Sequence, residues 1–319
     1  MASVGEPLEE ATPPEPSPPA GQRAAEDRFF APGGQTLALP SAVPTAEPSS
    51  QHAPFRFVQL ADTQLGMAAA MHKMQWLRKV RCALTACTCG CVDAKQLVPV
   101  PRAGPSLTPG TAEELNALEL ELSKRAVKAI NALQPRPTFA VVCGDLVNGK
   151  DKLGTQEHQD ATAAFKQVFS DIHEDISLVC LCGNHDVGDR PTPTTIAAWK
   201  GHFGDDYFSF FVSGVKFIVI NSQYLKDGTG APEEAAAQEA WLDLELSAGK
   251  EQGQQIVVFS HHPPFINDPE EPDGYFALGR TTRLRLLGKM ARAGVTTVSE
   301  DRFCFASTLY RWLASATLT

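Results

Sequence analysis

Residues 180–189 read CLCGNHDVGD, and they place polar side chains directly after an apolar run. The apolar run is typical of a buried strand. A plain turn would account for Gly183 and Asn184, because both residue types tolerate the backbone angles that turns require. It would not account for His185 and Asp186, which follow at once. The stretch therefore predicts a strand that ends at a functional site.

Three other apolar runs end in the same way, with ADTQ at 61–64, CGDL at 143–146 and FSHHPP at 259–264. Taken singly, such residues could be turn or cap residues. In open α/β sheets, however, ligands bind outside the carboxyl ends of the strands, so four polar clusters predict one shared site. Oxygen donors mixed with imidazole suit Mn²⁺, Fe²⁺ or Zn²⁺. The candidate side chains are Asp62, Gln64, Asp145, Asn184, His185, Asp186, His261 and His262.

Strands alternate with helices along the chain, which predicts an α/β fold. Apolar periodicity predicts helices over 113–133, 156–173, 232–247 and 280–292. A hairpin turning at Ser213-Gly214 indicates that the sheet is mixed rather than purely parallel. A short strand, GVTTV, follows the last helix.

Composition shifts divide the chain into parts. Residues 1–50 hold ten of the 24 prolines, which predicts a disordered arm. One folded domain is expected over 51–299, with an irregular insertion over 77–112 that contains the cysteines of TACTCGC. These cysteines fit no common zinc module. The sequence changes character near Ser299, so 300–319 is expected to be a divergent tail.

The net charge of −9 argues against a broad nucleic-acid-binding surface. No apolar run is long enough for a transmembrane helix, so no membrane association is expected. The first 25 residues lack the apolar core of a signal peptide. Reduced thiols and a cytoplasmic location are therefore expected, with Cys143, Cys180 and Cys182 as small core residues.

The four clusters together resemble the motifs of the calcineurin-like metallophosphoesterases. The matching motifs, in order, are Asp62-x-Gln64, Gly144-Asp145, Gly183-Asn184-His185-Asp186 and His261-x-Pro263. The phrases GNHDVG, GDDYFSF and INSQ, and Gln64 where most relatives have histidine, resemble one subfamily in particular. The likeness covers about 51–76 and 113–298. It implies a β-sandwich flanked by helices, in four layers α-β-β-α, that is truncated at its C-terminal end.

The resemblance also implies a site for two divalent metal ions of the Mn²⁺, Fe²⁺ or Zn²⁺ class. Asp62 and Gln64 would bind the first ion, Asp145 would bridge the two ions, and Asn184 with His261 would bind the second. A hydroxide held by the ions would attack phosphorus. His185 would then act as general acid, and Asp186 would orient its ring.

The family pattern ends in a Gly-His-x-His motif, and this chain has no histidine after His262. Each ion is then expected to lose one imidazole, with Glu300 or Asp301 as replacements by position. The leading hypothesis is a phosphomonoesterase that acts on phosphoserine or phosphothreonine proteins, with a signalling kinase as a candidate partner. The alternatives are a catalytically impaired binding or regulatory isoform and a phosphodiesterase for cyclic nucleotides.

Overall fold

Two five-stranded sheets form the centre of the molecule in the computed structural model, which describes residues 55–61, 63–65, 112–149, 152–295 and 297–299 together with the strand segments 36–37, 81–88 and 91–97. The first sheet has the order β4 (Cys91–Leu97), β3 (Arg81–Thr88), β2 (Phe55–Ala61), β5 (Phe139–Cys143) and β6 (Ser177–Leu181). The second has the order β1 (Thr36–Leu37), β7 (Phe208–Val212), β8 (Val215–Val219), β9 (Gln255–Phe259) and β10 (Thr297–Ser299).

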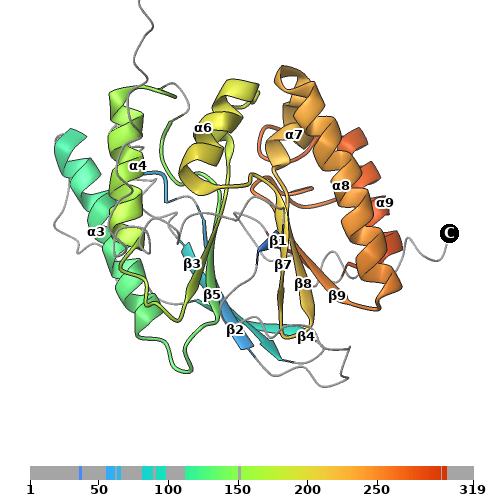
Figure 1. The fold of residues 1–319 in the computed structure, drawn as a ribbon, viewed down its shortest axis with the longest axis horizontal. Coiled ribbons are helices and arrows are strands. Elements are labelled where there is room, and N and C mark those ends of the chain that lie inside the picture. The colour runs from blue at the N-terminus through green and yellow to red at the C-terminus, as the bar shows by residue number, and fades with distance from the viewer. Residues whose placement is uncertain are drawn as a thin grey trace, which may run out of the picture.

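Helices cover the outer face of each sheet (Figure 1). The first sheet packs against α3 (Ala112–Asn131), α4 (Gln156–Phe169) and α6 (Pro193–Phe203). The second packs against α8 (Pro232–Glu251) and α9 (Arg280–Ala293). The short elements α5 (Asn184–Val187), α7 (Ser222–Asp227) and η3 (Gly228–Gly230) follow strands or join helices. The predicted four-layer α-β-β-α sandwich is therefore confirmed.

Phenylalanine rings fill the space between the two sheets. Phe139 of β5 is fully buried and stacks on Phe57, with ring centroids 4.7 Å apart. It also meets Phe210 and Phe217 of the second sheet edge to face, at 5.3 and 5.2 Å. Successive side chains of a strand point to opposite faces, so the alternate residues of β5 reach the helical layer. This strand is thus apolar on both faces, as the run FAVVC predicts.

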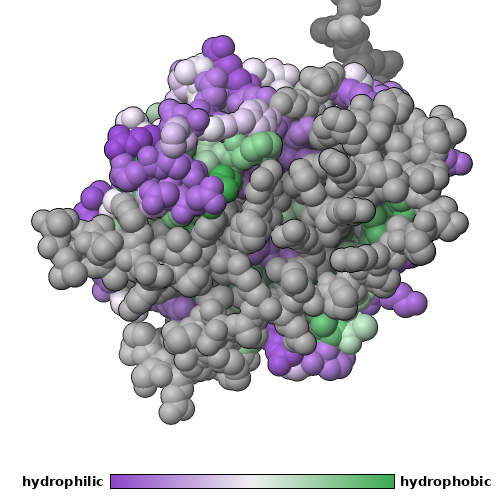
Figure 2. Space-filling view, turned by 180° about the vertical axis from the view of Figure 1, so that it is seen from behind, coloured by the Kyte–Doolittle hydropathy of each residue, from purple (hydrophilic) through white to green (hydrophobic). Residues whose placement is uncertain are grey.

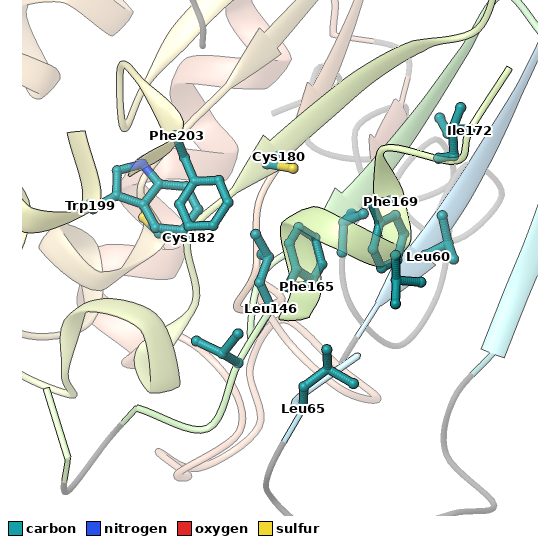
Figure 3. Close-up of a cluster of buried hydrophobic side chains, with 14 of the residues drawn as sticks. Leu60, Leu65, Leu146, Phe165, Phe169, Ile172, Cys180, Cys182, Trp199 and Phe203 are labelled. Atoms are coloured by element: carbon teal, nitrogen blue, oxygen red, sulfur yellow. The ribbon is translucent and has the colours of Figure 1, made fainter. Parts of the chain in front are cut away.

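A second core lies between the first sheet and its helices (Figure 3). Phe165 and Phe169 of α4 stack at 4.3 Å, and Phe203 of α6 meets Phe165 edge to face at 5.9 Å. Leu65 and Leu146, from the segments after β2 and β5, belong to the same cluster. The segments that carry the candidate site are therefore fixed to the core by their own apolar residues.

The two sheets are mixed, as the predicted hairpin indicated. Strands β7 and β8 pair antiparallel, whereas β2, β5 and β6 pair in parallel, as do β8, β9 and β10. The hairpin turns at Ser213 and Gly214, which both have positive φ, at 47° and 79°. A two-residue turn of this kind matches the twist of the flanking strands. The turn position is the predicted one.

Some expectations differ from the structure. The insertion over 77–112 was expected to be irregular, but β3 and β4 form an antiparallel pair there, and β3 extends the first sheet beside β2. Within the Pro-rich arm, Thr36–Leu37 pairs with β7. The other residues of 1–50, the side chains of the cysteine cluster and the tail 300–319 lie outside the described residues. Helices α6 and α7 were not predicted, because both are short and lack a clear apolar period.

Cys143, Cys180 and Cys182 are buried free thiols, as expected. Burial raises the pKa of both Cys180 and Cys182 above that of an ordinary thiol, and nearby carboxylates raise each pKa further. Where described residues are visible from behind, they are mainly hydrophilic with a few small hydrophobic areas (Figure 2). Among the described residues, no helix combines the length and the apolar character that a bilayer crossing requires.

Candidate metal centre

The candidate site lies where β2, β5, β6 and β9 end. Gly144 and Asp145 follow β5 with φ values of 81° and 52°, and Gln64 follows β2 with φ of 36°. Among the described non-glycine residues, Ser213 of the hairpin turn is the other one with positive φ. Backbone in this region is costly for a residue with a side chain, so it persists where the surrounding contacts hold it. Here the bends aim Gln64 and Asp145 at each other.

The carboxylate of Asp145 is the central group of the site. It is buried, and its Oδ1 accepts a hydrogen bond from the backbone N–H of His185 at 2.9 Å. Its Oδ2 accepts one from Nε2 of Gln64 at 2.5 Å. The Nε2 atom of His261 lies 3.4 Å from Oδ1. The structure therefore brings together predicted residues from four separate segments.

His261 and Asn184 present lone pairs to the same point. Nδ1 of His261 lies 2.9 Å from the carbonyl oxygen of Cys143. A carbonyl oxygen only accepts, so Nδ1 carries the proton and the neutral ring has its lone pair on Nε2. That Nε2 atom is 3.2 Å from Oδ1 of Asn184. Two acceptors facing each other with no proton between them leave room for a cation.

The donor set fits a divalent metal ion. Metal–donor bonds of about 2.0–2.2 Å place neighbouring donor atoms about 3.0–3.5 Å apart. The separations from Nε2 of His261 to the oxygens of Asn184 and Asp145 fall in that range. Among the described residues, the buried Oε1 atom of Gln64 has no hydrogen-bond partner, which suits a ligand for a second ion beside Asp145. Asp62, predicted to bind that ion, lies outside the described residues.

Amide oxygens are needed to complete this centre. In the part of the chain that the structure describes, no three His, Cys, Asp or Glu side chains gather as a metal site. The described ligand candidates are therefore one carboxylate, one imidazole and two amides. Neutral amide oxygens bind divalent ions less tightly than charged ligands, so the predicted affinity of the described set is modest.

His185 lies beside the centre with its ring fixed by a residue that the sequence analysis missed. Its Nδ1 is 2.8 Å from Oδ1 of Asn148, and its Nε2 is 4.0 Å from Oδ2 of Asp145. Asn148 stands three positions after Asp145 on the same loop. Its polar side chain on the loop that follows β5 was the one signal that could have identified it.

Asp186 has a different role from the predicted one. Its carboxylate accepts hydrogen bonds from the backbone N–H groups of Gly183, Leu146 and Val147, at 2.8, 2.9 and 3.3 Å. It was expected to orient the ring of His185, and the structure gives that contact to Asn148 instead. Burial, with the charge of Asp145, raises the pKa of Asp186 to about 8. Asp186 thus joins the loops that follow β5 and β6.

The segments GDDYFSF (204–210) and INSQ (220–223) are joined to each other and to His262 by hydrogen bonds. Asn221 donates a hydrogen bond to Asp206 at 3.0 Å, and its Oδ1 accepts one from the backbone N–H of Gln223. Nε2 of Gln223 lies 2.8 Å from Nδ1 of His262. The backbone N–H of His262 donates to Ser222 at 2.9 Å. His262, one of the candidate side chains of the sequence analysis, therefore contacts helix α7 through Gln223 and Ser222.

The four-layer sandwich and this centre define the class of the metallophosphoesterases. The family model for the calcineurin-like phosphoesterases matches residues 55–287, and the chain belongs to that family. The family supports hydrolase activity and implies divalent metal ions. The resemblance inferred from the four ordered motifs is thereby confirmed.

The relatives found by sequence also agree with the subfamily suggested by GNHDVG, GDDYFSF and INSQ. The serine/threonine-protein phosphatase CPPED1 of Mus musculus is 37% identical over 280 residues, which are 88% of this chain and 78% of the mouse protein. That of Rattus norvegicus is 43% identical over 186 residues, which are 58% of this chain and 59% of the rat protein. A solved dimetal phosphatase from Danio rerio is 15% identical, with a TM-score of 0.45, and the match covers 77% of this chain and 80% of that one.

Gly183 has no room for a side chain beside Asp145. A Cβ atom there would lie 2.2 Å from Oδ1 and 2.5 Å from the backbone nitrogen of Asp145. Gly183→Ala is expected to displace the loop and to lower the free energy of unfolding by about 1–3 kcal/mol. Urea unfolding would measure this loss. Gly201→Ala is the control, because a Cβ atom at that helical position meets nothing. Equal stability of the two variants would contradict the tight contact.

Proposed function

We propose that the protein is a metal-dependent phosphomonoesterase that removes phosphate from phosphoserine or phosphothreonine in proteins. The observation that carries the proposal is that Oδ1 of Asn184 and Oδ1 of Asp145 lie 3.2 and 3.4 Å from Nε2 of His261. Family membership and the names of the relatives support the same reaction class. The substrate class follows those names, and a signalling kinase remains a candidate partner.

Two ions would be held by different residues. Asp145, Asn184 and His261 would hold one ion, and Asp62, Gln64 and Asp145 the other. When bound, divalent ions of the Mn²⁺, Fe²⁺ or Zn²⁺ class supply a hydroxide near neutral pH and neutralise charge on the phosphoryl oxygens. The negative charge of Asp145 would reduce the repulsion between two cations held on either side of it. The hydrogen bond of Nδ1 of His261 to the carbonyl oxygen of Cys143 leaves Nε2 as the atom that would face the ion.

His185 would donate the proton that the leaving oxygen requires. Oδ1 of Asn148 accepts a hydrogen bond from Nδ1, so the second proton of the charged ring sits on Nε2. That atom lies on the side of Asp145, 4.0 Å from its Oδ2. The backbone N–H of His185 is meanwhile held by Oδ1 of Asp145, which keeps acid and metal ligand at a fixed separation.

The location of this reaction is also a proposal. We propose a cytoplasmic location, because the buried thiols of Cys143, Cys180 and Cys182 are free, as is usual for proteins of reducing compartments. Intracellular phosphoproteins would then be the available substrates. Fractionation of cells that express the full chain would test this.

The direct test is hydrolysis by purified protein with Mn²⁺. We expect release of phosphate from a phosphoserine peptide, and a fall of about 10²-fold in kcat for His185→Ala, because a positioned general acid contributes about that much. His173→Ala is the matched control, since His173 precedes β6 at the end of the strand opposite the site. Equal rates for wild type and His185→Ala would contradict the assignment.

Two other outcomes would identify the alternatives. Hydrolysis of a cyclic nucleotide in preference to the peptide would indicate a phosphodiesterase. Failure to bind Mn²⁺, with the fold intact, would indicate a binding or regulatory protein. Either result would overturn the proposed phosphomonoesterase.

A further inference from the structure

We propose that Tyr275 connects substrate recognition to the metal centre: its hydroxyl orients the metal ligand Asn184, and its ring forms, with Phe276, the surface that receives the peptide around the phosphorylated residue. The recognition half of this proposal rests on the proposed function. The positioning half concerns metal binding alone.

Three side chains form a closed triangle of hydrogen bonds. The amide nitrogen of Asn184 donates to Oδ1 of Asp189 at 3.0 Å and to the hydroxyl of Tyr275 at 3.1 Å. The hydroxyl of Tyr275 donates to the same Oδ1 of Asp189 at 3.1 Å. Both protons of the amide and the proton of the phenol are thus used. Tyr275 lies 91 residues from Asn184 in the sequence, so this contact is made by the fold.

The triangle decides which end of the amide faces the metal. An asparagine side chain can turn so that its NH₂ group replaces its oxygen. A carboxylate accepts and never donates when ionised, so Asp189 draws the NH₂ group of Asn184 toward itself. Oδ1 of Asn184 is then left facing Nε2 of His261. Asp189 and Tyr275 are therefore positioning residues for the metal ligand.

The loop that carries Tyr275 is fixed by contacts with α7 and by hydrogen bonds within the loop. Lys226 of α7 donates to the carbonyl oxygen of Gly274 at 2.6 Å and to that of Ala277, and its ammonium lies 5.9 Å from the centroid of the Tyr275 ring. Earlier in the same loop, the carboxylate of Glu271 accepts hydrogen bonds from the backbone N–H groups of Ile266, at 2.7 Å, Asn267 and Asp268. The loop is therefore built to present Tyr275 rather than to leave it free in solvent.

The outer side of this loop carries an aromatic surface. Tyr275 and Phe276 are 50% and 52% exposed, and their rings meet edge to face at 5.1 Å. In the described part of the chain, Leu244 on α8 is the other exposed large hydrophobic side chain. Single exposed hydrophobic residues are common on protein surfaces, but two adjoining exposed rings beside a proposed metal ligand indicate a binding surface. A phosphopeptide fits them, because its phosphate would lie at the metals and its flanking residues against the rings.

Two substitutions test the positioning role and the recognition role independently. Tyr275→Phe keeps the ring and removes the hydroxyl, so we expect Mn²⁺ to bind about 10–100-fold more weakly. Turnover should fall at limiting Mn²⁺ and recover at saturating Mn²⁺, with an unchanged KM for the peptide. Phe276→Ala should leave Mn²⁺ affinity unchanged and raise the KM for a phosphoserine peptide about 2–10-fold, since aromatic contacts of this kind are worth about 0.5–1.5 kcal/mol. Leu244→Ala is the control for removing an exposed apolar side chain.

Mn²⁺ affinity is measured by the paramagnetic resonance signal of the free ion, and KM by phosphate release from the peptide and from p-nitrophenyl phosphate. Wild-type Mn²⁺ affinity in Tyr275→Phe would overturn the positioning role. An unchanged peptide KM in Phe276→Ala, or an equal rise in Leu244→Ala, would overturn the recognition role. If the wild type hydrolyses neither phosphoester, the proposed function and the recognition role fail together. The Mn²⁺ titrations still decide the positioning role.

Discussion

Asp145→Asn is expected to lower metal-dependent hydrolysis by about 10³-fold, because an ion centre that stabilises the transition state by several kcal/mol loses its charged ligand. The substitution keeps the shape of the side chain and removes its charge. Oδ1 can still accept from the backbone N–H of His185. The amide of Gln64 can turn its unpartnered Oε1 toward the new NH₂ group. The fold should therefore persist while Mn²⁺ binding is lost.

The measurement is phosphate release as a function of Mn²⁺ concentration, with circular dichroism to follow the fold. Asp160→Asn is the matched control, since Asp160 lies exposed on α4 and accepts a hydrogen bond from Gln156. Retention of more than about a tenth of the wild-type rate in Asp145→Asn would show that Asp145 is not the shared ligand.

Phe139→Ala is expected to give the largest loss of stability, about 3–5 kcal/mol in the free energy of unfolding. Phe139 is fully buried between the sheets and contacts Phe57, Phe210 and Phe217. Rings from both sheets surround it, so the cavity left by alanine has few ways to close. Urea unfolding of the full chain measures the change.

Phe276→Ala serves here as the stability control, because it makes the same chemical change at an exposed position and should stay within about 0.5 kcal/mol of the wild type. A loss below about 1 kcal/mol for Phe139→Ala would mean that the two sheets do not share one continuous core.

Much of the fold was predictable because its central strands are short apolar runs with clear ends. β5 lies inside the run TFAVVCGD, β6 begins one residue before the run LVCLCGNHD, and the hairpin turns at Ser213-Gly214 as its sequence indicates. Helix α6 has no strong apolar period, but Thr192 and Thr195 form a reciprocal cap around Pro193. That cap was a readable start signal for a helix.

The site was predictable in its residues but not in its connections. Polar residues after strands identified Asp145, Asn184 and His261, because the topology brings strand ends together. The contact of Asp186 with the backbone of Leu146 could not be predicted, since it depends on the exact approach of two loops. Tyr275 gave no signal, because it follows no strand and its partners are far away in the sequence.

The hydrogen bonds of Asp186 to the segments after β5 and β6 set limits on how this enzyme could diversify. An insertion or deletion in either segment would break the hydrogen bonds of Asp186 that join the two. A change in the length of one segment therefore requires a compensating change in the other. The loop that presents Tyr275 is anchored by Lys226 and Glu271 and carries none of the proposed metal ligands. If the proposed function holds, positions of that loop other than Tyr275 could change substrate preference without altering the proposed metal ligands, whereas a change of Tyr275 would also act on Asn184.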